Sequence, residues 1–242
     1  MRFYVAVCLT LLLGCAPKKK DTRPPLDTSD NLKRTYFKNG KVNTEISYKN
    51  GEKDGVARTY YINGNVNQEI YYKKGRRDGL AKRFYENGKL YQETQYVDDE
   101  MEGFRKKYDE DGKLLSEENY RNDFPCKGLK EYNSDGSLRS YPKLNIQPVD
   151  RIRQEGKFYL NLSMSDKTKR VKYYQGKLTS DGCVSSVLEP VLLIENKGIG
   201  QITYYMPPGS FKMEEVHVVA VVQTVFGSSY VTEASYNLSI DN

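Results

Sequence analysis

Aromatic and aliphatic residues recur at a fixed interval of 24 residues through the middle of the chain. Each aromatic position is followed by an Asn-Gly or Asp-Gly pair, and then by a run in which apolar and polar residues alternate. Such alternation predicts β-strands, and Asn-Gly or Asp-Gly between two strands predicts a hairpin, because both residues tolerate positive φ. Five hairpins are therefore expected over residues 32–141, with these turn glycines: Gly40, Gly64, Gly88, Gly112 and Gly136.

The spacing of charged residues predicts how these strands pair. If each Asn-Gly or Asp-Gly forms a two-residue turn, Arg34 lies opposite Glu45, and a cation lies opposite a glutamate in the next three hairpins. In the fifth hairpin, Lys130 is expected opposite Tyr141. A type I turn followed by a glycine bulge would shift the register by one residue and separate these pairs. The charge ladder comprises Arg34, Glu45, Arg58, Glu69, Lys82, Glu93, Lys106 and Glu117. Three further glycines are expected at the opposite ends of the hairpins: Gly55, Gly79 and Gly103.

One aromatic column is expected on the same face as the charge ladder, since side chains two positions apart in a strand share a face. This aromatic stripe comprises Tyr36, Tyr60, Phe84, Tyr108 and Tyr132. It supplies packing that a single-layer sheet otherwise lacks, and it also suits contacts with a protein or a glycan. Both interpretations stay open at this stage. The alternating charges are interpreted as a solvated face that fixes the register, and not as a row of catalytic acids.

The last third of the chain loses this interval. Pro142 and Pro148 mark a boundary, after which six or seven short alternating segments are separated by breaks such as "SDG", "PPGS" and "GSS". Short strands at this density predict a β-sandwich of immunoglobulin-like type over residues 149–242. The predicted fold class is all-β: an elongated antiparallel sheet of repeated hairpins, followed by this sandwich.

The amino terminus has the pattern of an export signal. A positive start precedes a twelve-residue apolar run, which is too short for a spanning helix, and "LLGC" ends it. This motif resembles the lipobox of bacterial lipoproteins, which implies a signal peptide over residues 1–14 and a diacylglycerol and palmitate-type acylation of Cys15. An ordinary secretory peptide with an incidental cysteine is the alternative. Residues 15–31, Pro-rich and charged, are expected to form a flexible linker. The enterobacterial sorting rule then favours the outer membrane over the inner membrane.

The repeated residues themselves resemble a known family. "YKNGEKDG" (48–55) and "YKKGRRDG" (72–79) are similar to the core of MORN repeats, and the longer unit looks like the MORN variant of bacterial envelope lipoproteins and of YwqK-type antitoxin proteins. The resemblance covers residues 32–141 and implies consecutive hairpins in one long, twisted, antiparallel sheet. This chain departs from the family pattern because it contains no tryptophan.

The composition and the motifs limit which partners and reactions the sequence supports. A net charge of +6, with 38 basic and 32 acidic residues interspersed, does not indicate a nucleic-acid partner. The sequence pairs no nucleophile with a base and contains no metal-binding or phosphate-binding motif, so we expect no enzymatic activity, no metal and no cofactor beyond the lipid on Cys15. The lone His217 is interpreted as structural. Cys126 and Cys183 are expected either to form a disulfide or to remain two free thiols.

Three functions fit this sequence. The first is a membrane-anchored envelope lipoprotein that binds an envelope protein or glycan, without catalysis, through the repeat sheet. The second is an envelope immunity protein, as the antitoxin resemblance implies. The third is a glycan-binding or glycan-processing protein.

Overall fold

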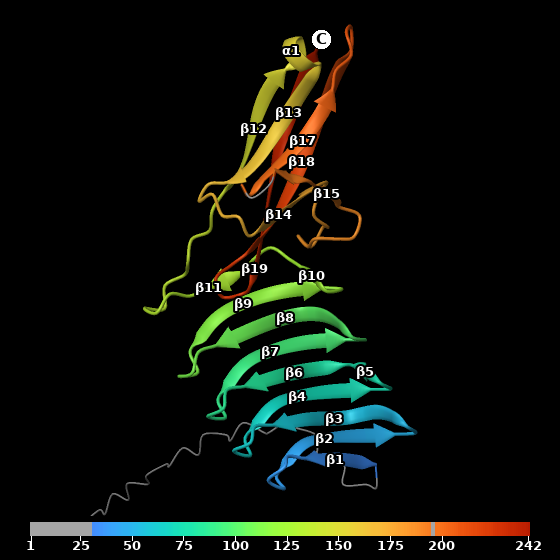
Figure 1. Ribbon diagram of the computed structural model, residues 1–242, viewed down its shortest axis with the longest axis vertical. Helices are drawn as coiled ribbons and strands as arrows, with labels where there is room; N and C mark the ends of the chain where they lie inside the picture. The colour runs from blue at the N-terminus through green and yellow to red at the C-terminus, as the bar shows by residue number, and fades with distance from the viewer. Residues whose placement is uncertain (1–30, 195–196) are drawn as a thin grey trace, which may run out of the picture.

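The computed structural model describes residues 31–194 and 197–242. The predicted signal peptide, Cys15 and nearly all of the predicted linker lie outside these residues. Figure 1 shows a long molecule in which one sheet of stacked hairpins is followed, along the same axis, by two further sheets. The predicted all-β class is confirmed, since a single four-residue helix accompanies the strands of the described part of the chain.

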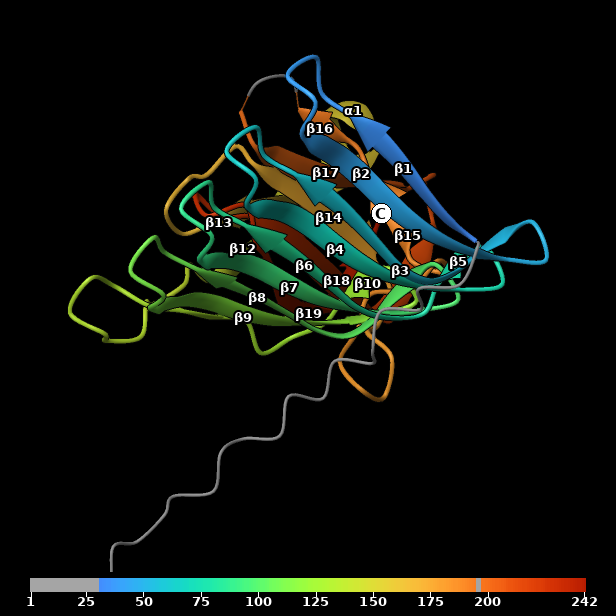
Figure 2. The same cartoon turned by 90° about the horizontal axis from the view of Figure 1, so that it is seen from below.

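The hairpins form one eleven-stranded antiparallel sheet, which we call the repeat sheet. Its main path runs in chain order, so each hairpin pairs only with its neighbours in sequence. Figure 2 shows the successive strands turning about the long axis, as the twist of a sheet requires. Its strands are β1 (Leu32–Tyr36), β2 (Val42–Lys49), β3 (Glu52–Tyr60), β4 (Val66–Lys73), β5 (Arg76–Arg77), β6 (Gly79–Phe84), β7 (Leu90–Val97), β8 (Glu100–Tyr108), β9 (Leu114–Arg121), β10 (Phe124–Pro125) and β11 (Lys130–Glu131).

The turns at the Asn-Gly end are not the predicted two-residue turns. The amide of Gly40 donates to the carbonyl of Phe37 at 3.0 Å, and the amide of Phe37 donates to the carbonyl of Lys41 at 2.8 Å. This is the alternative named from the sequence, a four-residue turn followed by a bulge at a glycine with φ of +80°, and the later repeats form the same pair of bonds. The two-residue turns lie at the other end of each hairpin. At Asn50–Gly51 both residues have positive φ, as a type I′ turn requires.

The longer turn nevertheless leaves the predicted charge register intact. Tyr36 lies opposite Val42, but Thr35 lies opposite Thr44, so the register shifts by one residue between Tyr36 and Thr35. This second irregularity cancels the effect of the longer turn and restores the pairing of Arg34 with Glu45. Gly55 was expected at a hairpin end but lies inside β3. Its φ is +97°, and an added Cβ would lie 3.2 Å from the Cβ of Ser47, where the β2–β3 register shifts. Gly79 and Gly103 also have positive φ and lie within β6 and β8.

The fifth hairpin is incomplete. Its turn is present and Tyr132 bridges to Leu138, but Lys130 pairs with Glu117 in β9. The predicted pairing of Lys130 with Tyr141 does not form, because the chain leaves the repeat sheet after this turn. The ring of Tyr141 instead stacks on Tyr230 of the following domain, with centroids 4.4 Å apart.

The last third is a sandwich of two four-stranded sheets, ordered β12-β13-β17-β16 and β15-β14-β18-β19. With β12 as the first strand, this is the A-B-E-D and C′-C-F-G order of the immunoglobulin fold. One core, including Leu160, Tyr173 and Val218, joins the sheets. The elements are β12 (Leu144–Arg151), α1 (Ile152–Glu155), β13 (Lys157–Met164), β14 (Val171–Gln175), β15 (Glu189–Val191), β16 (Leu193–Ile194), β17 (Ile199–Tyr205), β18 (Phe211–Gln223) and β19 (Ser229–Asp241).

The sandwich begins earlier than the predicted residue 149. β12 starts at Leu144 and includes Pro148, which lies opposite Leu160. A proline is tolerated there because β12 is an edge strand, where one missing amide need not interrupt the sheet. Pro148 therefore did not mark the boundary, whereas Pro142 lies two residues before the first strand of the sandwich.

Candidate functional site

The charge ladder lies on one face of the repeat sheet, which we call the ladder face. The Nε atom of Arg34 lies 2.6 Å from Glu45, and the Nη2 atom of Arg58 lies 2.6 Å from Glu69. Lys106 and Glu117 are 3.5 Å apart. Lys82 lies opposite Glu93 in the backbone register. The structure therefore places every predicted cation opposite its predicted glutamate.

Two tyrosines of the aromatic stripe bind glutamates of the ladder. The hydroxyl of Tyr60 donates to Glu45 at 2.6 Å, and that of Tyr108 donates to Glu93 at 2.7 Å. Burial and this hydrogen bond raise the pKa of Tyr60 to about 12. Burial alone would raise the pKa of Glu45, but hydrogen bonds from Tyr60 and Arg34 outweigh it and lower that pKa. Phe84 has no hydroxyl, so the third repeat lacks this bond.

The rings of the aromatic stripe are held against the sheet and not freely displayed. Tyr36, next to the outer edge, is 59% exposed, whereas the other four members are half-buried. The stripe thus serves the packing role, while the outer parts of the same side chains still face solvent. Hydrogen bonds and ion pairs hold the rings and charges of this face in fixed positions.

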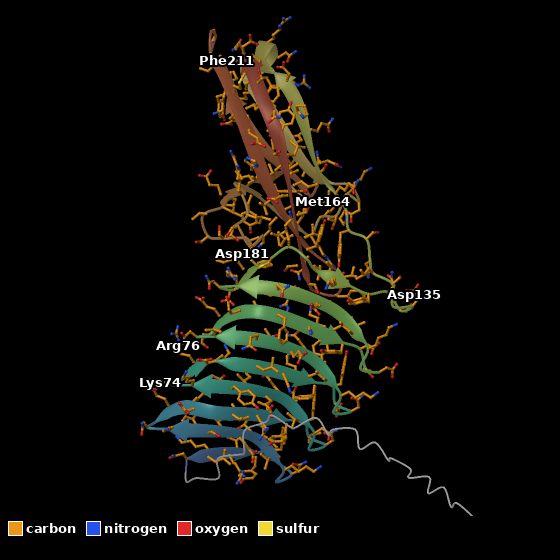
Figure 3. The ribbon with its side chains drawn as sticks, turned by 180° about the vertical axis from the view of Figure 1, so that it is seen from behind. Lys74, Arg76, Asp135, Met164, Asp181 and Phe211 are labelled. Atoms are coloured by element: carbon orange, nitrogen blue, oxygen red, sulfur yellow. A yellow bond between two sulfur atoms is a disulfide. The ribbon has the colours of Figure 1, made fainter. Side chains whose placement is uncertain are left out.

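Both long edges of the repeat sheet are tied from one repeat to the next. At the Asn-Gly edge, Tyr61 and Tyr85 donate their hydroxyls to the carbonyls of Phe84 and Tyr108, at 2.7 and 2.8 Å. At the opposite edge, Asp99 accepts from both the amide and the Nε atom of Arg77. Figure 3 shows Lys74 and Arg76 along that second edge and Asp135 on the first. These ties keep the ladder in register between hairpins.

The opposite face of the repeat sheet carries a second polar cluster, which we call the junction seat. It receives the tip of the β18–β19 hairpin, residues 224–229, from the sandwich. The seat comprises Arg105, Lys107, Ser116, Glu118 and Glu131, and all five side chains touch that tip or each other. In Figure 1 the ends of β18 and β19 reach down to β9 and β11.

The seat is buried and charged. Glu118, 1% exposed, accepts from Arg105 at 2.7 Å, from the hydroxyl of Tyr120 at 2.9 Å and from the amide of Ser229 at 3.0 Å. The ammonium of Lys107 donates to the carbonyl of Phe226 at 2.7 Å. Burial and the neighbouring Arg105 lower the pKa of Lys107. Opposed charges and backbone carbonyls thus make burial of the four ionic groups tolerable.

A disulfide completes the junction. Cys126, which follows β10, is bonded to Cys183 of the sandwich. Of the two alternatives left open by the sequence, the structure therefore shows the pair. Lys127 and Glu233 lie 2.8 Å apart beside it, and Arg121 pairs with Asp181. The repeat sheet and the sandwich are joined covalently, by salt bridges and by the junction seat.

Other candidate chemistry is sparse over residues 31–194 and 197–242. These residues contain no cluster of three or more His, Cys, Asp or Glu side chains arranged for a metal ion. His217, predicted to be structural, lies 3.2 Å from Glu215 on β18. Within the same ranges, no helix is long and apolar enough to cross a bilayer.

Sequence reasoning missed the junction seat, although a signal was available. At one repeat position, Ile46 and Ile70 of the early repeats are replaced by Glu118 in a later one. At another, Ala57 and Ala81 are replaced by Arg105. Where a charged residue replaces an apolar one at an equivalent position, that repeat contacts an element other than a neighbouring repeat. The sequence does not show which element this is.

Comparison with known families identifies the repeats. The model of the MORN repeat variant matches residues 30–50, 53–74, 77–98 and 101–122. The repeat sheet is built from MORN repeat variants. The incomplete fifth hairpin lies outside the four matches, in agreement with its loss of strand pairing.

No curated protein matches the chain by sequence. Among solved structures, a match is the crystal structure of accessory secretory protein 1,2 and 3 in Streptococcus pneumoniae, at 14% identity and a TM-score of 0.27. It covers 44% of this chain and 19% of that chain, so this chain spans about a fifth of the matched protein.

Proposed function

We propose that this protein is an envelope lipoprotein, anchored through acylated Cys15, that binds another protein without catalysis through the ladder face of its MORN repeat sheet. The outer membrane is its expected location, and the lipid its expected covalent group. No nucleic acid is proposed as a partner, because the ladder alternates in sign along its length.

The observation that carries the proposal is that the sandwich contacts one face of the repeat sheet and leaves the other face uncovered. The contacts of the sandwich tip fall on the junction seat, on the face opposite the charge ladder. The ladder face is left with half-buried rings, two of which, Tyr60 and Tyr108, donate their hydroxyls to glutamates. A rigid surface loses little conformational entropy on binding, which favours its use as an interaction platform.

A pull-down from solubilised envelope with the acylated protein tests the binding surface. The triple variant Tyr60→Ala, Phe84→Ala, Tyr108→Ala should lose a partner that the natural protein retains. The matched control is Thr44→Ala, Gln68→Ala, Gln92→Ala, which alters the opposite face at the same interval of repeats and should retain the partner. Loss with both variants, or with neither, would argue against the ladder face.

Metabolic labelling with palmitate tests the anchor. The natural chain should incorporate label and sediment with membranes, whereas Cys15→Ser should be unlabelled. Equal labelling of both chains would remove the lipoprotein part of the proposal without touching the binding surface.

An immunity role is the second candidate, supported by the MORN repeat variants that this chain has in common with antitoxin-type proteins. In that case, deletion of the gene should sensitise cells to a toxin delivered by sibling cells. Unchanged survival in mixed culture would leave the scaffold role as the better proposal.

A further inference from the structure

The sandwich has a second apolar cluster on the outer face of its β15-β14-β18-β19 sheet. Val184, Leu188, Val219 and Val231 are buried there, apart from the main core. Phe124 of the repeat sheet packs against them, together with three sandwich residues: Tyr174, Leu178 and Val221. The cluster thus draws on both halves of the molecule.

A cavity of about 680 Å³ opens beside this cluster. Phe124, Tyr174, Leu188 and Val221 form its apolar part. Small-molecule sites commonly measure about 300–1,000 Å³ and combine apolar walls with a few polar groups. The cavity therefore has the size and the apolar lining of a site for a small organic molecule.

Three cations line the same cavity. Lys169, Arg170 and Lys172 are exposed and come from the start of β14 and the residues just before it. None of the three has an ion-pair partner among the residues that the structure describes, although acidic residues pair with many other cations of the protein. Ser185 and Ser186 add hydroxyl groups to the lining.

We propose that this cavity binds a small organic anion, in which an anionic head group is joined to an apolar ring or short chain. The cations Lys169, Arg170 and Lys172 receive the head, and the apolar part lies against Phe124, Leu188 and Val221. This site is independent of the ladder face.

The disulfide links two walls of the cavity. Cys126 follows Pro125 and Cys183 precedes Val184, and Pro125 and Val184 both line the cavity. The amide of Val184 also donates to the carbonyl of Pro125 at 3.0 Å. The wall from the repeat sheet is thereby held against the wall from the sandwich, which presets the shape of the site.

A smaller neighbouring cavity, of about 410 Å³, is a competing location. Lys169 and Arg170 border both cavities, but the smaller one combines them and Arg139 with two carboxylates, Glu131 and Asp166, whereas no carboxylate lines the larger one. Lys172 lines the larger cavity and is not part of the smaller one. Lys172 is therefore the residue that separates the two locations.

Calorimetric titration of the full chain in neutral phosphatidylcholine vesicles tests this site, with protein-free vesicles as the blank. The probes are 1-naphthyl phosphate, uncharged 1-naphthol and inorganic phosphate. We expect naphthyl phosphate to bind at least about tenfold more tightly than either of the other two, because only it engages both parts of the cavity.

Lys172→Gln should weaken naphthyl phosphate binding by about tenfold, which is the size expected for one lost charge-assisted contact. Lys38→Gln, which changes another exposed lysine in the first repeat, should leave the affinity unchanged. Native binding by Lys172→Gln, or equal affinities for inorganic and naphthyl phosphate, would overturn the proposal. So would a gain in affinity from Asp166→Asn with no effect of Lys172→Gln, since the anion would then lie in the smaller cavity.

Discussion

The hydroxyl of Tyr60 in β3 donates a 2.6 Å hydrogen bond to the carboxylate of Glu45 in β2, fifteen positions earlier in the chain. Tyr108 and Glu93 repeat this bond at the same separation, at 2.7 Å. Each glutamate thus accepts from a ring of the next hairpin, and Glu45 also pairs with Arg34 of its own hairpin. Tyr60 and Tyr108 thus bond the aromatic stripe to two glutamates of the charge ladder.

Removal of the Tyr60 hydroxyl should destabilise the repeat sheet. Tyr60→Phe keeps the ring and loses a bond to a charged group, so the free energy of unfolding should fall by about 1.5–3 kcal/mol in urea denaturation. Tyr36→Phe, at an exposed position of the same column, should change it by less than about 0.5 kcal/mol. Equal effects of the two variants would show that the bond to Glu45 carries no stability.

Stability should fall at alkaline pH through the same tyrosine. The pKa of Tyr60 is raised to about 12 in the folded chain, against an ordinary value of 10.0, so the folded state retains a proton that the unfolded state has lost. This contribution is fully present below pH 10 and is lost as the pH rises towards 12. In an absorbance titration near 295 nm, the Tyr60→Phe variant should show one tyrosine fewer that ionises at a raised pH. An unchanged titration curve would contradict the assignment.

Removing the Glu118 carboxylate should release the tip of the β18–β19 hairpin from the junction seat, while the disulfide still joins the two halves. This carboxylate is 1% exposed, and its loss leaves Arg105, whose side chain is 18% exposed, without its partner, at a cost of about 3 kcal/mol. Glu118→Ala should therefore lower the denaturation midpoint strongly and speed amide hydrogen exchange over residues 224–229. The adjacent change Glu117→Ala affects a pair that is 30% exposed on the ladder face, and should cost at most about 1 kcal/mol. Similar losses of unfolding free energy in both variants would show that the junction seat stabilises the protein no more than an exposed ion pair does.

Loss of the disulfide should destabilise the chain without changing its strands. Cys126 and Cys183 are 57 residues apart, and opening a loop of that length costs about 4 kcal/mol in the chain-entropy model. The double variant Cys126→Ser, Cys183→Ser should keep the far-ultraviolet dichroism of the natural protein and unfold at lower urea. Labelling of the unfolded natural chain with a maleimide should find these two cysteines blocked until a reductant is added. Free thiols at both positions before reduction would contradict the structure.

The charge register was predictable because it depends on local geometry. A fixed interval brings like positions of successive hairpins side by side, and alternation in a strand assigns each side chain to a face. Arg34 and Glu45 could therefore be paired without coordinates. The sequence offered two turn types at Gly40 but could not decide between them, because a second irregularity beside Tyr36 compensates for the longer turn and keeps the same charge pairs.

The boundary at the sandwich and the junction seat depended on contacts that local patterns do not encode. Pro148 is tolerated only because β12 has a free edge, and the sequence does not state which strand is an edge. Glu118 and Arg105 pair within the repeat sheet, but they are buried because residues 224–229, more than a hundred positions later, cover them.

The sequence by itself determined the repeated hairpins, the face shared by rings and charges, and the sandwich class, because strand periodicity and turn chemistry act over a few residues. Only the tertiary structure decided that Cys126 joins Cys183, that a sandwich hairpin covers one face of the last repeats, and that a cation-lined cavity lies between the two halves. These features depend on segments far apart in the chain meeting in space, and no short-range pattern specifies such a meeting.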